Sequence, residues 1–177
     1  MIYVLLAEGF EEIEALTPVD LLRRAGLEVQ TVGVTGKTVT GSHGIPVVAD
    51  VTPDEMGACE LLILPGGMPG AKHLDEWEGM DPLLARVTDE GGRIAAICAA
   101  PMILGKRGYL KGRWAVCFPG FEDTLIGANL AGGRVITDGP YTTAIGMGAA
   151  HEFGAELVSC LLGIDEAARL YTETMGK

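Results

Sequence analysis

Short apolar segments that end abruptly in glycine-rich or small-residue turns are the feature that most restricts the fold of this chain. Three of them are typical of strands buried on both faces of a sheet: Ile2–Leu6, Leu61–Leu64 and Arg93–Ile97. Segments with helical spacing lie between and after them. Alternating strands and helices predict an α/β fold, a flavodoxin-like doubly wound parallel sheet sandwiched by helices.

The rest of the sequence extends this pattern. Further strands are expected at Leu27–Val34, Thr38–Thr40, Pro46–Val51, Trp114–Cys117, Arg134–Thr137 and Tyr141–Ala144, and helices at Glu11–Ala25, Met80–Glu90, beyond Cys98, around Phe153–Leu162 and at Asp165–Thr174. Pro18 lies inside the first helical segment and predicts a kink there, or a division at Thr17, because proline has no N–H to donate. One domain over residues 1–177 is expected, since about 100–200 residues per domain is usual.

The chain is acidic, with 13 Lys and Arg against 24 Asp and Glu and a net charge of −11. Binding to nucleic acid needs clustered cations, so this composition argues against it. No apolar run approaches the ~18 residues that span a bilayer. Ile2–Ala7 follows Met1 without the cationic residues of a signal peptide. We therefore expect a cytoplasmic protein that binds neither nucleic acid nor membranes.

Cysteine and histidine spacing gives no sign of a metal or a cofactor. The cysteines are Cys59, Cys98, Cys117 and Cys160. They are at least 19 residues apart and form no CxxC pair, which favours free thiols in a reducing compartment. Of the histidines, His73 is expected to be exposed and His151 to lie at the surface or an interface, while His43 could reach a ligand crevice from a partner subunit. Without a His–His–carboxylate group, no catalytic metal is implied.

Cys98 stands where an apolar strand turns at once into a helix. Small residues at Ala96 and Ala100 allow the close backbone approach of a nucleophile elbow. A thiol at a helix N-terminus feels the positive end of the helix dipole and unpaired N–H groups, both of which favour the thiolate. The alternative is that Cys98 is a small buried hydrophobe, as free cysteines often are.

Two other loops leave the carboxyl ends of expected strands, and such loops share one crevice in a parallel sheet. In the first, Glu11 and Glu12 are interpreted as solvated charges at a helix start, whereas Glu14 has apolar neighbours that would raise its pKa by desolvation. In the second, Gly66 and Gly67 offer consecutive backbone N–H groups suited to an oxyanion, although a simple tight turn would look the same.

Together these motifs resemble the ThiJ/PfpI superfamily, in the branch of the Parkinson-associated deglycase. The resemblance is carried by Glu8–Ala15 (EGFEEIEA), Thr17–Gly26, Leu64–Ala71 (LPGGMPGA), Ala95–Pro101 (AAICAAP) and Phe118–Asp123, and more loosely by Ala144–Gly154. It implies a class I glutamine amidotransferase-like fold and, in most members, a homodimer.

The resemblance also implies roles for four residues: Cys98 as the reactive cysteine, Glu14 as its carboxyl partner, and Gly67 and Ala99 as donors of oxyanion-type backbone N–H groups. The implied function is removal of reactive carbonyls, by conversion of methylglyoxal to lactate without glutathione or by deglycation of proteins. A small aldehyde or glycated substrate would be the partner. The same cysteine would alternatively serve an oxidative-stress sensor or chaperone, and a small amide or ester hydrolase or peptidase is a further alternative.

Two positions depart from the patterns of the superfamily. The protease-like branch has His directly after its cysteine, where this chain has Ala99, so proteolysis is disfavoured. The deglycase branch often has a His shortly before the proline of the next strand and turn. At this place the present chain reads Cys117-Phe118-Pro119. The third polar partner is therefore missing, or Cys117 partly replaces it. Cys117 is interpreted as structural, the alternative being a thiol that resolves an oxidised Cys98 as a disulfide.

Overall fold

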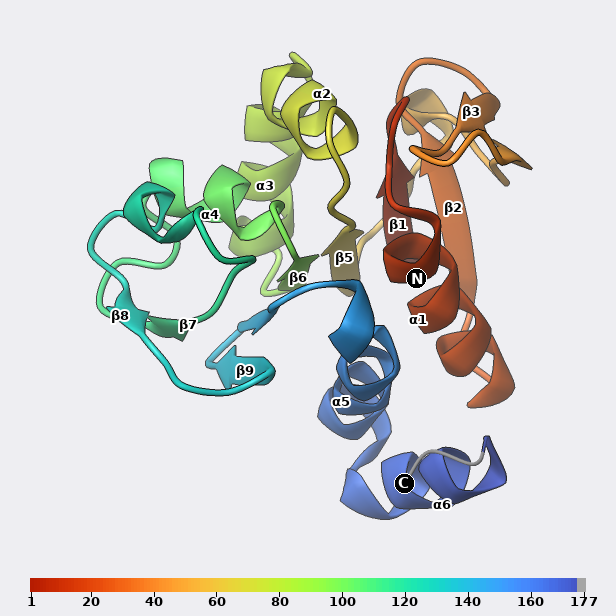
Figure 1. Ribbon diagram of the computed structural model, residues 1–177. Helices are drawn as coiled ribbons and strands as arrows, with labels where there is room; N and C mark the ends of the chain where they lie inside the picture. Colours follow the sequence, from red (N-terminus) through yellow and green to blue (C-terminus); the bar gives the residue numbers. More distant parts are fainter. Residues whose placement is uncertain (175–177) are drawn as a thin grey trace.

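The computed structural model describes residues 1–174, and its central feature is a six-stranded sheet in the order β2-β1-β5-β6-β10-β9 (Figure 1). These strands are β1 (Ile2–Leu6), β2 (Val29–Gly33), β5 (Leu61–Leu64), β6 (Arg93–Ile97), β9 (Val135–Asp138) and β10 (Tyr141–Ala144). All neighbours in the sheet are parallel except β9, which pairs antiparallel with β10 at one edge. The predicted doubly wound α/β fold is confirmed, with β9 as its antiparallel addition.

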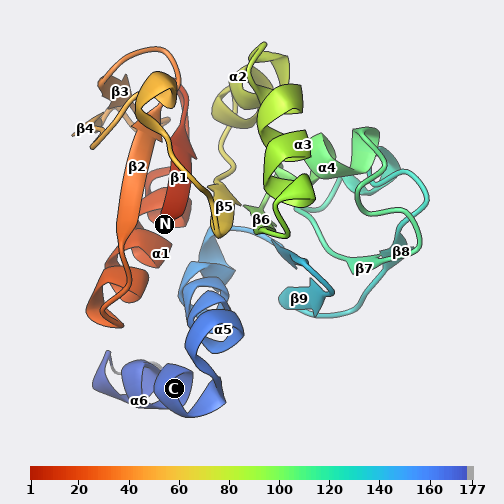
Figure 2. The same cartoon turned by 180° about the vertical axis from the view of Figure 1, so that it is seen from behind.

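Helices cover both faces of this sheet, as the two opposite views show (Figures 1 and 2). They are α1 (Glu12–Arg24), α2 (Gly70–Glu76), α3 (Met80–Asp89), α4 (Pro101–Lys106), α5 (Ala150–Leu162) and α6 (Ile164–Glu173). Alternate residues of β1 enter two apolar clusters: Leu5 packs with α2, α3 and α4, whereas Val4 and Leu6 pack with α1, α5 and α6. Alternation along a strand buried on both faces therefore builds two cores from one sheet.

Helix α1 runs unbroken through Pro18, so of the two expected outcomes, a kink or a division at Thr17, the division is wrong. Helix α5 packs closely against α1 at this point: a β-carbon at Gly154 would lie 3.3 Å from the Pro18 Cα and 2.6 Å from a methyl carbon of Leu21. Leu21 itself is buried in the cluster that joins the two helices. Tertiary packing thus keeps a helix continuous where the local rule for proline predicts a break.

The smaller elements lie outside the central sheet. Strands β3 (Thr38–Thr40) and β4 (Pro46–Val48) form the expected hairpin, and β7 (Trp114–Ala115) pairs in parallel with β8 (Asn129–Leu130). Short 3-10 turns occur at Pro53–Glu55, Glu122–Thr124 and Met147–Ala149.

Strand β7 ends two residues before the predicted boundary at Cys117. The reason is that the backbone leaves the β7–β8 ladder there, and the N–H of Phe118 donates to the carbonyl oxygen of Cys98 at 2.8 Å. Helix α2 was not predicted, because its seven residues follow directly on the glycine-rich loop and are too few to show a clear helical period.

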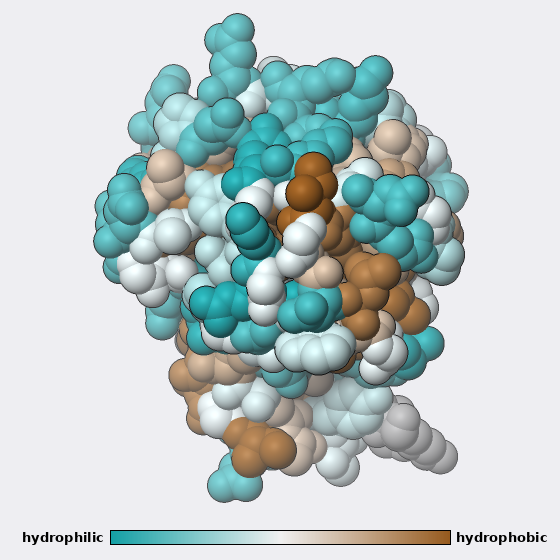
Figure 3. All heavy atoms as spheres, turned by 90° about the vertical axis from the view of Figure 1, so that its left-hand side faces the viewer, coloured by the Kyte–Doolittle hydropathy of each residue, from teal (hydrophilic) through white to brown (hydrophobic). Residues whose placement is uncertain are grey.

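The side of the molecule that carries α4, β7 and β8 is largely hydrophilic, with apolar side chains gathered in patches (Figure 3). Within residues 1–174, every helix is too short or too polar to cross a membrane.

Candidate active site

Cys98 occupies a strained turn at the carboxyl end of β6. Its φ angle is +65°, and no other residue besides glycine has a positive φ within residues 1–174. The Cys98 N–H donates to the carbonyl oxygen of Ala144 at 2.9 Å, and the flanking Ala96 and Ala100 are fully buried. A left-handed conformation costs free energy for a residue with a β-carbon, so the surrounding hydrogen bonds must hold it. This is the geometry of the expected nucleophile elbow.

Glu14 lies in the first turn of α1 and is fully buried. Its Oε2 accepts a hydrogen bond from the Gly66 N–H at 2.9 Å, while its Oε1 has no hydrogen-bond partner in the described chain. Burial raises the pKa of Glu14 to about 7; the Cys98 thiol opposes this rise, and the charge of Glu11 adds to it. The apolar neighbours of Glu14 in the sequence therefore indicated the correct direction of the shift.

The expectation of a readily ionised Cys98 thiol is wrong when Glu14 is charged. Burial raises the pKa of Cys98 to about 12, and repulsion from the Glu14 carboxylate adds to the rise. The backbone N–H groups of Gly67 and Ala99 act in the opposite direction, because they favour the thiolate. Helix α4 starts only at Pro101 and has six residues, so its dipole acts weakly on the sulfur.

The raised pKa values of Cys98 and Glu14 have the same main cause, which is the burial of both groups; in addition, the Glu14 carboxylate raises the pKa of Cys98, whereas the hydrogen bond with the Cys98 thiol lowers that of Glu14. Such groups titrate as a pair that shares one proton rather than as two independent acids. When Glu14 carries the proton it is neutral and no longer repels a thiolate at Cys98. The backbone N–H groups of Gly67 and Ala99 then favour the thiolate without an opposing negative charge. The four residues that the sequence singled out therefore form one cluster.

Glu11 and Glu12 are buried, so their interpretation as solvated charges is wrong. Glu11 caps α1, and its Oε2 accepts a hydrogen bond from the Glu14 N–H at 2.8 Å. Glu12 accepts hydrogen bonds from the His43 backbone N–H at 2.8 Å, and its Oε2 lies 2.9 Å from the His43 Nδ1. Burial opposes ionisation of Glu12, but the hydrogen bonds from His43 outweigh it and lower the pKa to about 2.

A pocket of about 400 Å³ opens above Cys98. It is lined by Glu11, Ser42, His43, Gly67, Met68, Cys98, Ala99, Phe118, Phe121 and Met147. His43 thus reaches the pocket from the same chain, at the tip of the β3–β4 hairpin. The apolar lining was not predicted, although Met147 follows β10 and could have been found by the same carboxyl-end rule that indicated Cys98.

The other thiols and histidines do not line the pocket above Cys98. Cys117 is buried in the apolar cluster with α2, α3 and α4, on the opposite side of the sheet from the cluster that contains Cys98, and burial raises its pKa to about 11. All four cysteines are free thiols. His73 is exposed, as expected, and His151 is half-buried, with its ring edge-on to Tyr171 at 4.8 Å.

One group of side chains in residues 1–174 has the spacing of metal ligands: Glu11, Glu12 and His43, whose ligand atoms lie within 4.8 Å of one another. Within this group, the Glu12 carboxylate is already hydrogen-bonded to the backbone N–H and to the Nδ1 of His43. The side chains therefore form an ion-pair cluster that does not need a metal to pair them.

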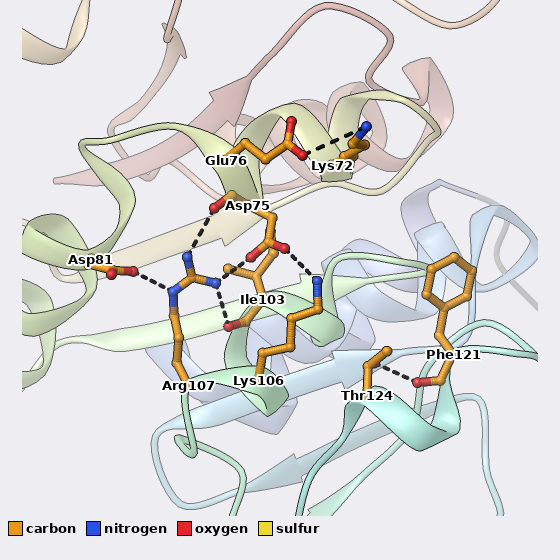
Figure 4. A network of polar contacts seen from close by, with 9 residues as sticks. All are labelled: Lys72, Asp75, Glu76, Asp81, Ile103, Lys106, Arg107, Phe121 and Thr124. Atoms are coloured by element: carbon orange, nitrogen blue, oxygen red, sulfur yellow. Dashed lines mark hydrogen bonds and ion pairs between the residues drawn. The ribbon is translucent and has the colours of Figure 1, made fainter.

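Charged side chains join α2 and α4, the helices that follow the glycine-rich loop and the Cys98 turn (Figure 4). Asp75 in the last turn of α2 pairs with Arg107, just beyond α4, and with Lys106 at 2.6 Å. Arg107 also pairs with Asp81 in α3 and donates to the Ile103 carbonyl oxygen at 3.1 Å. Because α2 and α4 start from the loops of Gly67 and Cys98, this network fixes the two loops relative to each other.

Comparison with known proteins agrees with this fold. The chain matches the DJ-1/PfpI family over residues 1–160. It is 34% identical to the Parkinson disease protein 7 homolog of Danio rerio over 174 residues, covering 94% of this chain and 92% of that protein. It is 33% identical to a protein named as a deglycase in Pyrococcus horikoshii over 145 residues, covering 79% and 86%.

Solved structures give the same result. A DJ-1 superfamily protein from Salmonella typhimurium superposes with a TM-score of 0.94 at 31% identity, covering 99% of this chain and 98% of its own. The oxidised DJ-1 of Toxoplasma gondii superposes with a TM-score of 0.92 at 33% identity, covering 98% and 97%. The family expected from the sequence motifs is confirmed: the chain belongs to the DJ-1/PfpI family.

Proposed function

We propose that this protein is an enzyme that removes reactive carbonyl compounds, with Cys98 as nucleophile and Glu14 as general acid and base. The observation that carries the proposal is the buried Glu14 carboxyl, with a pKa of about 7, beside a thiol held in a strained elbow. A general acid and base works best when its pKa is near the working pH. The relatives named as deglycases support the same class of chemistry.

With methylglyoxal as substrate, the Cys98 thiolate adds to the aldehyde carbon, and the new alkoxide takes a proton to give a hemithioacetal. The N–H groups of Gly67 and Ala99 stabilise the negative charge that develops during addition. Glu14 then removes the proton from the former aldehyde carbon and returns a proton to the neighbouring ketone carbon, while the hydroxyl proton on the first carbon passes to the ketone oxygen. The first carbon is thereby oxidised and the second reduced. Water hydrolyses the resulting thioester, releasing lactate and the free thiol, so that one water is consumed in each turnover.

The same residues would act in deglycation. There the aldehyde-derived carbon is already attached to an amine or thiol of a protein, and attack by Cys98 displaces that group. The absence of histidine at position 99 leaves Glu14 as the proton-transfer group beside the sulfur, which favours carbonyl chemistry over hydrolysis of peptides.

A second candidate function is sensing of oxidants, in which a peroxide oxidises the Cys98 thiolate to a sulfinate. Protonated Glu14 would stabilise that product by donating a hydrogen bond to it. The similar Toxoplasma gondii DJ-1 has been solved in an oxidised form, which supports this alternative.

Turnover separates the two candidates. Purified protein is incubated with methylglyoxal or glyoxal, and lactate or glycolate is quantified beside Cys98→Ser and Glu14→Gln variants. We expect product from the wild type, none from Cys98→Ser, and a large loss in Glu14→Gln. If all three proteins are equally inactive, the enzyme proposal fails and the peroxide sensitivity of Cys98 becomes the test of the second candidate.

We further propose a cytoplasmic homodimer. Free thiols suit a reducing compartment. Large apolar side chains of α1 and β4 are exposed, including Ile13 at 52% and Val48 at 73%, as expected for surfaces that meet a second copy. Sedimentation equilibrium of the wild type and of Ile13→Glu checks this assembly; a monomeric wild type contradicts it.

A further inference from the structure

Much of the wall of the pocket above Cys98 is apolar. Phe118, Phe121, Met68 and Met147 form this wall. Three of them are large apolar side chains left open to solvent: Met68 is 51% exposed, Met147 42% and Phe118 40%. Their contact with water is unfavourable in the empty pocket, so an apolar group placed there gains free energy.

The Phe118 ring lies close enough to the sulfur to contact a molecule bound to it. A β-carbon at Gly146 would be 3.1 Å from the Phe118 Cδ2 and 3.9 Å from the Cys98 Sγ, so ring and sulfur border the same small space. The Phe118 N–H donates to the Cys98 carbonyl oxygen at 2.8 Å, which fixes the backbone that carries the ring. When a carbon atom of the substrate is bonded to the Cys98 sulfur, a substituent next to that carbon would therefore contact the Phe118 ring.

The pocket also borders on acidic side chains. Glu11 lines it, and the buried Glu12 and Glu14 follow Glu11 in the first turn of α1. His43 is the one cationic group paired with them in the described chain, and Glu12 already holds it. An anion entering this pocket is repelled by carboxylates in a partly desolvated site, where the repulsion is stronger than in water.

We propose that this site selects neutral 1,2-dicarbonyl compounds with an aromatic or bulky apolar substituent, that it disfavours anionic 2-oxo acids, and that Phe118 and Met147 determine this preference. The proposal rests on the proposed function for the carbonyl chemistry, whereas the preference belongs to the pocket itself. The volume of about 400 Å³ lies within the ~300–1,000 Å³ of small-molecule sites and leaves room beyond a methyl group.

Alkylation of Cys98 tests the preference independently of turnover. Iodoacetamide, 2-iodo-N-phenylacetamide and iodoacetate each form a C–S bond with loss of iodide, and the thiol proton passes to solvent. Rates at Cys98 are followed by peptide mass spectrometry and divided by the rates with 2-mercaptoethanol, which removes the intrinsic reactivity of each reagent. We expect the phenyl reagent to react about ten-fold faster than iodoacetamide, and iodoacetate to react more slowly than iodoacetamide.

Variants assign this preference to the wall. Phe118→Ala and Met147→Ala should each lose most of the phenyl preference while still reacting with iodoacetamide, and circular dichroism confirms that they fold. Ile126→Ala is the matched control, because Ile126 is 61% exposed and does not line the pocket. Equal normalised rates for the three reagents with the wild type, or a phenyl preference that survives in both wall variants, would overturn the proposal.

Turnover then separates this proposal from the proposed function. We expect kcat/KM to be higher for phenylglyoxal than for methylglyoxal. If methylglyoxal and phenylglyoxal are converted equally well, the function stands and the preference fails. If neither is converted, the function fails, and the alkylation rates alone decide the preference.

Discussion

Glu14 and Cys98 meet across Gly66: the Glu14 Oε2 and the Cys98 Cβ lie 2.5 and 2.6 Å from the position that a β-carbon at residue 66 would occupy. The glycine thus allows a carboxyl and a thiol from distant parts of the chain to approach each other. Its own N–H holds the carboxyl in place.

Gly66→Ala should separate this pair. The added methyl group has to displace Glu14, Cys98 or the backbone, and overpacking of a buried site costs about 1–3 kcal/mol of unfolding free energy. We expect urea denaturation to show that loss and methylglyoxal turnover to disappear. Gly57→Ala is the control, since its β-carbon would meet only the Tyr3 hydroxyl, at 3.8 Å. Full activity in Gly66→Ala would show that close approach is not required.

Glu14→Gln should impair proton transfer without removing the nucleophile. Glutamine keeps the shape and still accepts from the Gly66 N–H, but it cannot exchange a proton, and loss of a general acid or base costs about 10²–10⁴ in rate. In the wild type, the pH profile of kcat should show a step near the Glu14 pKa of about 7 that the variant lacks. An unchanged profile would assign the step to another group.

Glu14 should also make the protein less stable at high pH. Its folded-state pKa of about 7 lies above the ordinary value of 4.5, so its contribution to stability is fully present below pH 4.5 and is lost as the pH rises to 7. The loss amounts to about 3 kcal/mol between these limits. Urea denaturation at pH 5 and pH 8 should show a smaller decrease for Glu14→Gln than for the wild type. Parallel decreases in both proteins would contradict this assignment.

Arg107→Met should destabilise the junction of α2, α3 and α4. It leaves Asp75, whose side chain is 14% exposed, with Lys106 but without its second cationic partner, and hydrogen bonds to charged groups are worth about 1.5–3 kcal/mol. Lys72→Met is the control in the same view (Figure 4), because the Lys72–Glu76 pair is exposed and such pairs contribute less than about 1 kcal/mol. Thermal unfolding of both variants measures the difference, and equal melting temperatures would count against the network.

Much of the fold could be predicted because the buried strands are short, apolar and followed by sharp turns. Ile2–Leu6, Leu61–Leu64 and Arg93–Ile97 have the predicted bounds. The continuity of α1 through Pro18 could not be predicted, since it depends on α5 packing against α1 at Gly154, far away in the sequence. The antiparallel direction of β9 was not predicted either, although the two-residue connection between Asp138 and Tyr141 is a local signal for a hairpin.

For the site, it could be predicted that Cys98, Glu14 and Gly67 lie together, because the loops that follow parallel strands meet at the carboxyl edge of the sheet. This rule gave no information on burial. Glu11 and Glu12 look like ordinary charges at a helix start, but Glu12 is covered by Ser42 and His43 of the β3–β4 hairpin, and the Glu11 carboxylate accepts from the Glu14 N–H. The raised pKa of Cys98 was missed for a related reason, since it depends first on the burial of the thiol and then on the charge of Glu14, 84 positions earlier in the chain.

The left-handed backbone at Cys98 has a consequence for which residues this position accepts. Glycine adopts such angles freely, and a side chain there costs on the order of 1 kcal/mol or more. Selection for foldability alone would therefore place glycine at residue 98. A cysteine at this position therefore lowers the stability of the folded chain, because its backbone angles favour a residue without a side chain. Residues with strained backbone angles cluster at functional sites in proteins.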